Sequence, residues 1–64
     1  MKVYSVLRHM QYEGSDLLGV FGSREDALKF VDTQTEDRKY YDFGVVESEL
    51  GQKVDFYMDV EWVE

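Results

Sequence analysis

The acidic residues near the end of the chain are the side chains with the clearest potential for chemistry. If residues 40–50 and 54–62 form neighbouring strands, residues two apart on each strand lie about 6.6 Å apart and point the same way. Such spacing resembles that of phosphates along a nucleic-acid strand, so a protein surface built to hold phosphates could bind these carboxylates instead. We therefore predict one partner-binding site, made by Glu47, Glu49, Asp55, Tyr57, Asp59 and Glu61.

The same carboxylates could instead serve solubility or bind a metal. The exposed side of a half-buried sheet must be polar, and acidic residues there keep a protein in solution. Paired carboxylates can also bind a metal ion or act as acid and base. However, no histidine stands near them in the sequence and no calcium-loop spacing occurs. We therefore expect neither a metal site nor a cofactor.

His9 is the only histidine and the main candidate for catalysis. Catalysis by histidine needs a nucleophile and an orienting acid, and the setting of a nucleophilic serine on a sharp turn is missing from the sequence. One of the serines, Ser23, fits a helix cap better. We expect His9 to be a solvent-facing strand residue and the protein not to be an enzyme.

The charge balance narrows the class of partner. Fourteen acidic residues against seven basic ones give a net charge of −7. Binding to nucleic acid or to an anionic membrane needs lysines and arginines that displace counterions from phosphates. We therefore expect no direct binding to nucleic acid or membrane, and a basic protein as the better partner.

The length of 64 residues fits a single domain over residues 1–64, and the absence of cysteine excludes disulfides and thiolate zinc sites. Stability must then come from apolar packing or from association with another copy. Aromatic residues such as Tyr4, Tyr41 and Trp62 could join a homodimer through an uncovered sheet face. Neither a signal peptide nor a membrane span is evident in the sequence, which predicts a cytoplasmic location.

The first half of the chain predicts two strands and a helix. Residues 2–10 are rich in valine and tyrosine and favour a strand, and residues 17–21 favour a second strand that pairs back as a hairpin. Ser23 then caps a helix over residues 24–34, with Asp26 placed to complete the cap and Glu25 four residues before Lys29. Residues 33–39 fit neither period and predict a loop.

The second half predicts two more strands. The third covers residues 40–50 and twists or bulges near Gly44. Gly51 and Gln52 form a tight link to a last strand, in which the residues from Val54 to Trp62 alternate between apolar and acidic sides. The fold class is thus α+β, a ββαββ arrangement whose small antiparallel sheet has one helix packed on one face.

Three segments of the chain resemble a group of short bacterial and phage proteins. They are KVYSV at residues 2–6, GVFGSREDALKF at 19–30 and VVESEL at 45–50. The resemblance implies a ββαβ-type core and a phage or prophage origin, and it carries no catalytic or ligand-binding residues. The acidic last strand departs from the group and is where a particular function would lie.

The leading hypothesis is a small acidic, inhibitor-like module encoded by a phage. It would present its carboxylate-rich strand face to the basic, nucleic-acid-binding surface of a protein in the bacterial host and act there as a nucleic-acid mimic. The alternative is a structural or assembly homodimer without an inhibitory role.

Overall fold

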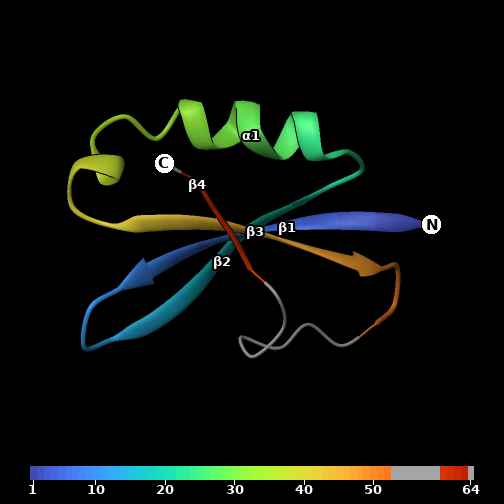
Figure 1. Cartoon of the computed structure of the whole chain (residues 1–64), viewed down its shortest axis with the longest axis horizontal. Coiled ribbons are helices and arrows are strands. Elements are labelled where there is room, and N and C mark those ends of the chain that lie inside the picture. The colour runs from blue at the N-terminus through green and yellow to red at the C-terminus, as the bar shows by residue number, and fades with distance from the viewer. Residues whose placement is uncertain (53–59, 64) are drawn as a thin grey trace.

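The computed structural model describes residues 1–52 and 60–63. These residues form a four-stranded antiparallel sheet and one α-helix, so the fold is α+β, as predicted. The strands lie in the order β2-β1-β3-β4, and β1 and β3 form the centre of the sheet (Figure 1). Their bounds are Lys2–Met10 for β1, Gly14–Phe21 for β2, Asp42–Glu49 for β3 and Glu61–Val63 for β4.

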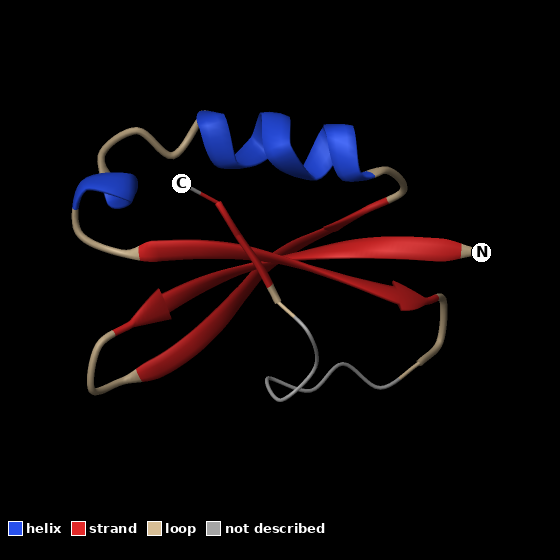
Figure 2. Ribbon diagram, viewed as in Figure 1, coloured by secondary structure: helices blue, strands red, loops and turns tan. Residues whose placement is uncertain are grey.

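The helix α1 (Arg24–Asp32) follows β2 and lies along one face of the sheet (Figure 2). A short 3-10 helix, η1 (Asp37–Lys39), comes between α1 and β3. The predicted ββαββ order has a loop in place of η1, so the predicted element order is not matched in full. The loop prediction failed because a single 3-10 turn is too short to produce a hydrophobic period.

The start of α1 follows the prediction for Ser23 and for Glu25 with Lys29, but among the described residues the Asp26 side chain does not complete the cap. The Ser23 side chain accepts a hydrogen bond of 3.1 Å from the Asp26 backbone N–H, and Lys29 pairs with Glu25 at 3.3 Å. The helix ends at Asp32, two residues earlier than predicted. The Thr33 N–H bonds back to the carbonyl of Phe30, three residues before it, which tightens the last turn.

The hairpin of β1 and β2 is confirmed, and β1 has the predicted bounds. However, β2 begins at Gly14 instead of residue 17. The chain reverses over residues 11–13, where Tyr12 has a φ of 73° and the Glu13 N–H bonds to the Met10 carbonyl at 3.1 Å. The polar residues from Gly14 to Asp16 therefore extend the strand beyond the turn.

A bulge lies in β2 and not at Gly44. The register passes from Val6 opposite Gly19 to Leu7 opposite Leu17, so Leu18 has no partner on β1. Gly44 pairs regularly with Leu7 and Trp62, so of the predicted twist or bulge near Gly44 the bulge is wrong. A glycine is needed at Gly44 because a side chain there would collide with the Val60 Cγ1 and approach the Trp62 ring.

Both faces of the sheet contain buried residues. The face under α1 holds the main core of Val6, Ala27, Val31, Phe43 and Val45. The opposite face also has buried members on the central strands, namely Ser5, Leu7, Val46 and Ser48. Alternation along β1 and β3 therefore places apolar side chains on both sides near the centre of the sheet.

The end of the chain differs from the prediction of a tight hairpin. A two-residue link at 51–52 would place residue 58 opposite Val45, whereas Val45 faces Glu61 in β4. Gly51 does have the expected positive φ, 88°, in a turn closed by the Gln52 N–H and the Glu49 carbonyl at 2.9 Å. Trp62, which ends the apolar side of the predicted last strand, is 51% exposed. The rest of the predicted last strand, residues 54–59, lies outside the described residues.

Candidate partner-binding surface

Three of the predicted site residues lie on one face of the sheet. Glu47 and Glu49 are two apart on β3, and Glu61 on β4 is opposite Val45, so all three side chains share a face. This is the face that carries α1, not the open one that the prediction assumed. The other three predicted residues, Asp55, Tyr57 and Asp59, lie outside the described residues.

Each of these three glutamates is paired with a cation of the same chain. Lys2 Nζ lies 3.0 Å from Glu47, the N-terminal ammonium lies 3.2 Å from Glu49, and Arg24 lies 2.7 Å from Glu61. Each of the three predicted carboxylates in the described part of the surface therefore has a cation partner within the chain. The cations come from the start of the chain and from the start of α1, which are distant from β3 and β4 in the sequence but adjacent in the fold.

The contact between Arg24 and Glu61 has the most directional geometry of the three. Arg24 Nε donates to Glu61 Oε2 at 2.8 Å, and Arg24 Nη2 forms an ion pair with the same oxygen at 2.7 Å. The hydrogen bond from Arg24 lowers the pKa of Glu61, and the same bond raises the pKa of Arg24. Both side chains are about half exposed. Solvent screens such a pair, so a competing charge can displace one partner at small cost.

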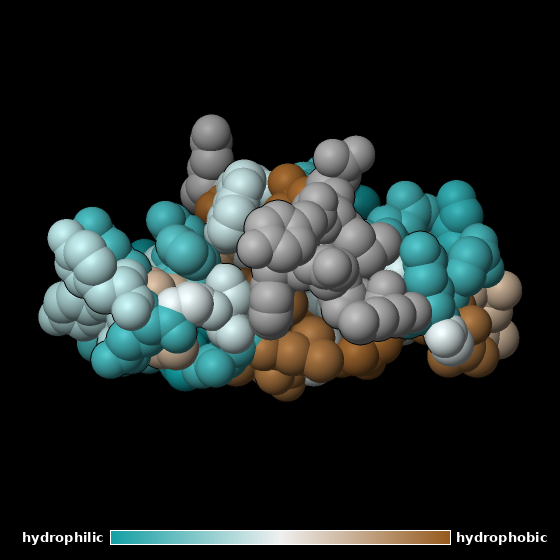
Figure 3. Space-filling model, turned by 90° about the horizontal axis from the view of Figure 1, so that it is seen from below, coloured by the Kyte–Doolittle hydropathy of each residue, from teal (hydrophilic) through white to brown (hydrophobic). Residues whose placement is uncertain are grey.

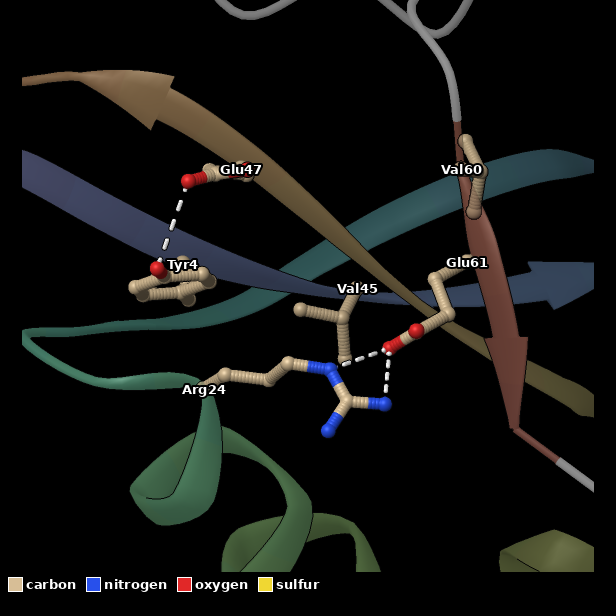
Figure 4. Close-up of a pocket in the computed structure, with 6 residues that line it drawn as sticks. All are labelled: Tyr4, Arg24, Val45, Glu47, Val60 and Glu61. Atoms are coloured by element: carbon tan, nitrogen blue, oxygen red, sulfur yellow. Dashed lines mark hydrogen bonds and ion pairs between the residues drawn. The ribbon is translucent and has the colours of Figure 1, made fainter.

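A crevice of about 260 Å³ lies between the start of α1 and the sheet. Figure 4 shows Arg24 reaching across it to Glu61, while Tyr4 donates to Glu47 at 3.3 Å on the other side. The volume is below the ~300–1,000 Å³ typical of ligand pockets. The polar groups that line it already bind one another, so the crevice is the space between two sets of paired side chains.

The cations of the described residues are all used within the molecule. Each lysine and arginine of residues 1–52 lies within 4.0 Å of a carboxylate; these residues are Lys2, Arg8, Arg24, Lys29, Arg38 and Lys39. Arg8 takes two carboxylates, Asp16 and Asp37. A phosphate backbone would therefore have to break existing pairs to find a cation on this part of the chain.

Among residues 1–52 and 60–63, three acidic side chains have no ion pair: Glu13, Asp26 and Asp42. Glu13 lies at the tip of the hairpin, Asp26 in the first turn of α1, and Asp42 at the start of β3. None of the three was predicted as a site residue, because pairing depends on which cations the fold brings near.

Exposed aromatic residues gather at one end of the molecule, where β1 ends and β3 begins. Tyr12 in the hairpin turn and Tyr40 after η1 are 96% and 76% exposed, and Tyr41 and Trp62 are also exposed. Figure 3 views the face opposite α1, with near-neutral and polar surface at the hairpin end and apolar surface along one side. Tyrosine and tryptophan at a surface are frequent anchors of protein interfaces.

Two kinds of feature are absent from residues 1–52 and 60–63. No group of three or more histidine, cysteine, aspartate or glutamate side chains there could hold a metal ion. No helix in this part of the chain is long and apolar enough to cross a membrane.

Comparison with known proteins gives one match. A family model described as a domain of unknown function, DUF7336, matches residues 1–57. The chain belongs to this family. The DUF7336 match includes β1 to β3 and the three segments of the resemblance noted in the sequence, and it ends before β4. Neither the curated proteins nor the solved structures gave a match.

Proposed function

We propose that this member of the DUF7336 family is a small acidic protein-binding module without enzymatic activity, which docks on a basic surface of another protein. The observation that carries the proposal is the charge arrangement of the described residues. Their lysines and arginines are all occupied by the chain's own carboxylates, and a surplus of acidic side chains remains.

A basic protein complements this arrangement, since opposite potentials steer encounter and favour docking. The net charge of −7 repels nucleic acids and anionic membranes. An arginine of the partner could replace the N-terminal ammonium at Glu49 or Lys2 at Glu47. Both pairs are well exposed, and such pairs are readily exchanged.

The predicted contacts are Glu47, Glu49 and Glu61, with Asp55, Tyr57 and Asp59 outside the described residues. Within the proposal, the partner is a nucleic-acid-handling protein of a bacterial host, the module has a phage origin, and binding inhibits the partner by competing with nucleic acid. These finer statements rest on the sequence resemblance and the charge layout. They remain predictions.

A homodimer is the second candidate, and one observation favours it. Leu17 and Val20 on β2 are 53% and 54% exposed, and with Trp62 they lie on the face of the sheet opposite α1. A second copy could cover these side chains. Sedimentation at micromolar and nanomolar concentrations separates the two candidates, because only the homodimer requires self-association.

The main proposal is tested by capture from a bacterial lysate on the immobilised full chain at low salt, followed by elution with a salt gradient. We expect a basic protein to elute, and its affinity for the purified module to fall as ionic strength rises. Replacing Glu47, Glu49 and Glu61 by glutamine should weaken binding further, since the partner loses three carboxylates. An affinity that does not change with ionic strength, or a partner that is not basic, would contradict electrostatic docking.

A further inference from the structure

A second hollow lies at the aromatic end of the molecule, away from the crevice between α1 and the sheet. It has a volume of about 370 Å³, and the described residues that line it are His9, Gln11, Tyr40 and Asp42. The volume falls within the ~300–1,000 Å³ typical of ligand pockets. These residues come from residues 9–11 at the end of β1 and residues 40–42 at the start of β3, so two segments that are distant in the sequence meet there.

Asp42 supplies a negative charge that nothing in the described residues neutralises. It is opposite His9 in the register of β1 and β3, and its side chain is exposed with no ion pair. No lysine or arginine of the described residues lines the hollow. A ligand with a positive charge would thus meet a carboxylate that does not first have to leave another partner.

His9, which lines the hollow, is contacted from two sides. Its Nδ1 lies 3.2 Å from Ser15 Oγ of β2, within hydrogen-bond distance. On the other side, the Trp62 ring of β4 meets the His9 ring edge-on, with centroids 5.9 Å apart and planes at 72°. Contacts from two different strands fix the ring orientation, so part of the hollow is formed before any ligand arrives.

An aromatic ring beside a carboxylate is a typical site for a cationic side chain, because the ring face and the carboxylate both attract positive charge. The same chain already contains one such arrangement elsewhere. The Arg8 guanidinium lies 5.2 Å from the centroid of Tyr41 and binds Asp16 and Asp37 at 3.1 and 2.7 Å. At the hollow, Tyr40 and Asp42 provide the ring and the carboxylate, but the cation is not supplied by the described residues.

We propose that this hollow binds an arginine or lysine side chain of the basic partner protein, with Asp42 pairing with its charge and Tyr40 contacting its apolar stem. The inference rests on the proposed function and adds a contact to those predicted from the sequence. An anionic ligand is disfavoured because the described lining contains a carboxylate and no lysine or arginine.

The experiment is a titration of the ¹⁵N-labelled full chain with N-acetyl-arginine amide. Binding is monitored by NMR through the shifts of the backbone amide signals. We expect saturable shifts at His9, Gln11, Tyr40 and Asp42. The substitution Asp42→Asn should weaken binding roughly twofold to fivefold. The matched control is Asp26→Asn, which removes the same charge from another unpaired aspartate, at the start of α1, and should leave the affinity unchanged.

A second variant and a second probe keep the test sharp. Tyr40→Leu retains an apolar side chain but removes the ring, and should also weaken binding of the arginine probe. N-acetyl-leucine amide has no charge and should give no saturable shift at the hollow. Equal loss of affinity in Asp26→Asn and Asp42→Asn would overturn the proposal, as would equal binding of the leucine probe. The dispersion of the amide signals verifies that each variant is folded.

Failure of this site can be distinguished from failure of the proposed function. If a basic protein binds with strong salt dependence but Asp42→Asn leaves its affinity unchanged, the function stands and the hollow is not the contact. If the arginine probe binds at Asp42 but no basic protein is captured, the cation site stands and the proposed function is wrong.

Discussion

Arg24 and Glu61 join the first residue of α1 to the first residue of β4. Two nitrogens of Arg24 contact a single oxygen of Glu61, Nε through a hydrogen bond of 2.8 Å and Nη2 through an ion pair of 2.7 Å. Among the described residues, the three-residue strand that Glu61 begins pairs only with β3. The ion pair therefore adds a side-chain link between β4 and the helix layer, which the backbone ladder does not provide.

This link predicts a pH-dependent stability. Arg24 holds the folded-state pKa of Glu61 below its ordinary value of 4.5. The contribution to stability is therefore present above the unfolded-state pKa and is lost as the pH falls through the folded-state pKa. Glu61→Gln should unfold at a lower temperature than the wild type at about pH 7, and the difference should vanish at an acidic pH below the folded-state pKa of Glu61. Thermal unfolding, monitored by circular dichroism, measures this difference in melting temperature.

The control for Glu61→Gln is Glu13→Gln, at an exposed acid that has no ion pair among the described residues. It should have little effect on the melting temperature at either pH. A difference between Glu61→Gln and the wild type that is the same at both pH values would show that charge pairing with Arg24 is not its cause.

Gly44 predicts a sensitive position in the centre of the sheet. A Cβ at this residue would collide with the Val60 side chain and lie 3.2 Å from the Trp62 ring. Overpacking of this kind costs about 1–3 kcal/mol, so Gly44→Ala should lower the melting temperature by roughly 4–8 °C for each kcal/mol. Gly22→Ala is the control, because no described atom lies within 4 Å of the position its methyl group would take and its φ is not positive. Equal melting temperatures for the two variants would refute the close contact.

The contacts of Arg8 are expected to stabilise the segment that leads into β3. Arg8 Nη1 binds the Asp37 carboxylate at 2.7 Å, and the Asp37 carbonyl accepts the N–H groups of Tyr40 and Tyr41 at 3.0 and 2.9 Å. Arg8→Lys keeps the charge but loses the planar fork that reaches two carboxylates. Hydrogen exchange at the Tyr40 and Tyr41 amides should become about tenfold faster. This corresponds to a decrease of about 1.4 kcal/mol in the free energy of local opening.

The control for Arg8→Lys is Arg24→Lys, which makes the same substitution at an arginine bound to a carboxylate on another part of the molecule. It should leave exchange at Tyr40 and Tyr41 unchanged. Slow exchange at these amides in Arg8→Lys would mean that Arg8 does not secure the segment.

The side chain of Ser23 is expected to stabilise the start of α1. Its side chain accepts the Asp26 N–H at 3.1 Å, and loss of such a cap costs about 1 kcal/mol. Ser23→Ala should therefore melt roughly 4–8 °C lower than the wild type. Ser23→Asp retains an acceptor and should recover most of the loss. If both variants melt alike, the hydrogen bond is not the source of the effect.

Local signals in the sequence predicted much of the fold. Val and Tyr in β1 predicted its bounds, and Ser23 predicted the start of α1, because strand propensity and capping act over a few residues. The bulge at Leu18 and the register of Val45 with Glu61 were missed. Both are set by hydrogen bonding between strands, which no pattern within a single strand records.

The candidate surface was predicted less well for the same reason. Alternation correctly placed Glu47, Glu49 and Glu61 on one face, but it could not show that α1 lies on that face. Phe43 and Val46 are both buried on opposite faces of β3, so the apolar pattern of this strand does not single out a side. The cations that neutralise the glutamates, such as Lys2 and Arg24, arrive only through the fold.

The unpartnered Leu18 has a consequence for the solution behaviour of the protein. Its strand, β2, forms one border of the described sheet, and the opposite border is the three-residue β4. A strand of another molecule that paired with β2 would lose its regular hydrogen-bond spacing at the bulge. On β4, such a strand could pair with only three described residues. Within the described residues, both borders of the sheet are therefore poor templates for a further strand.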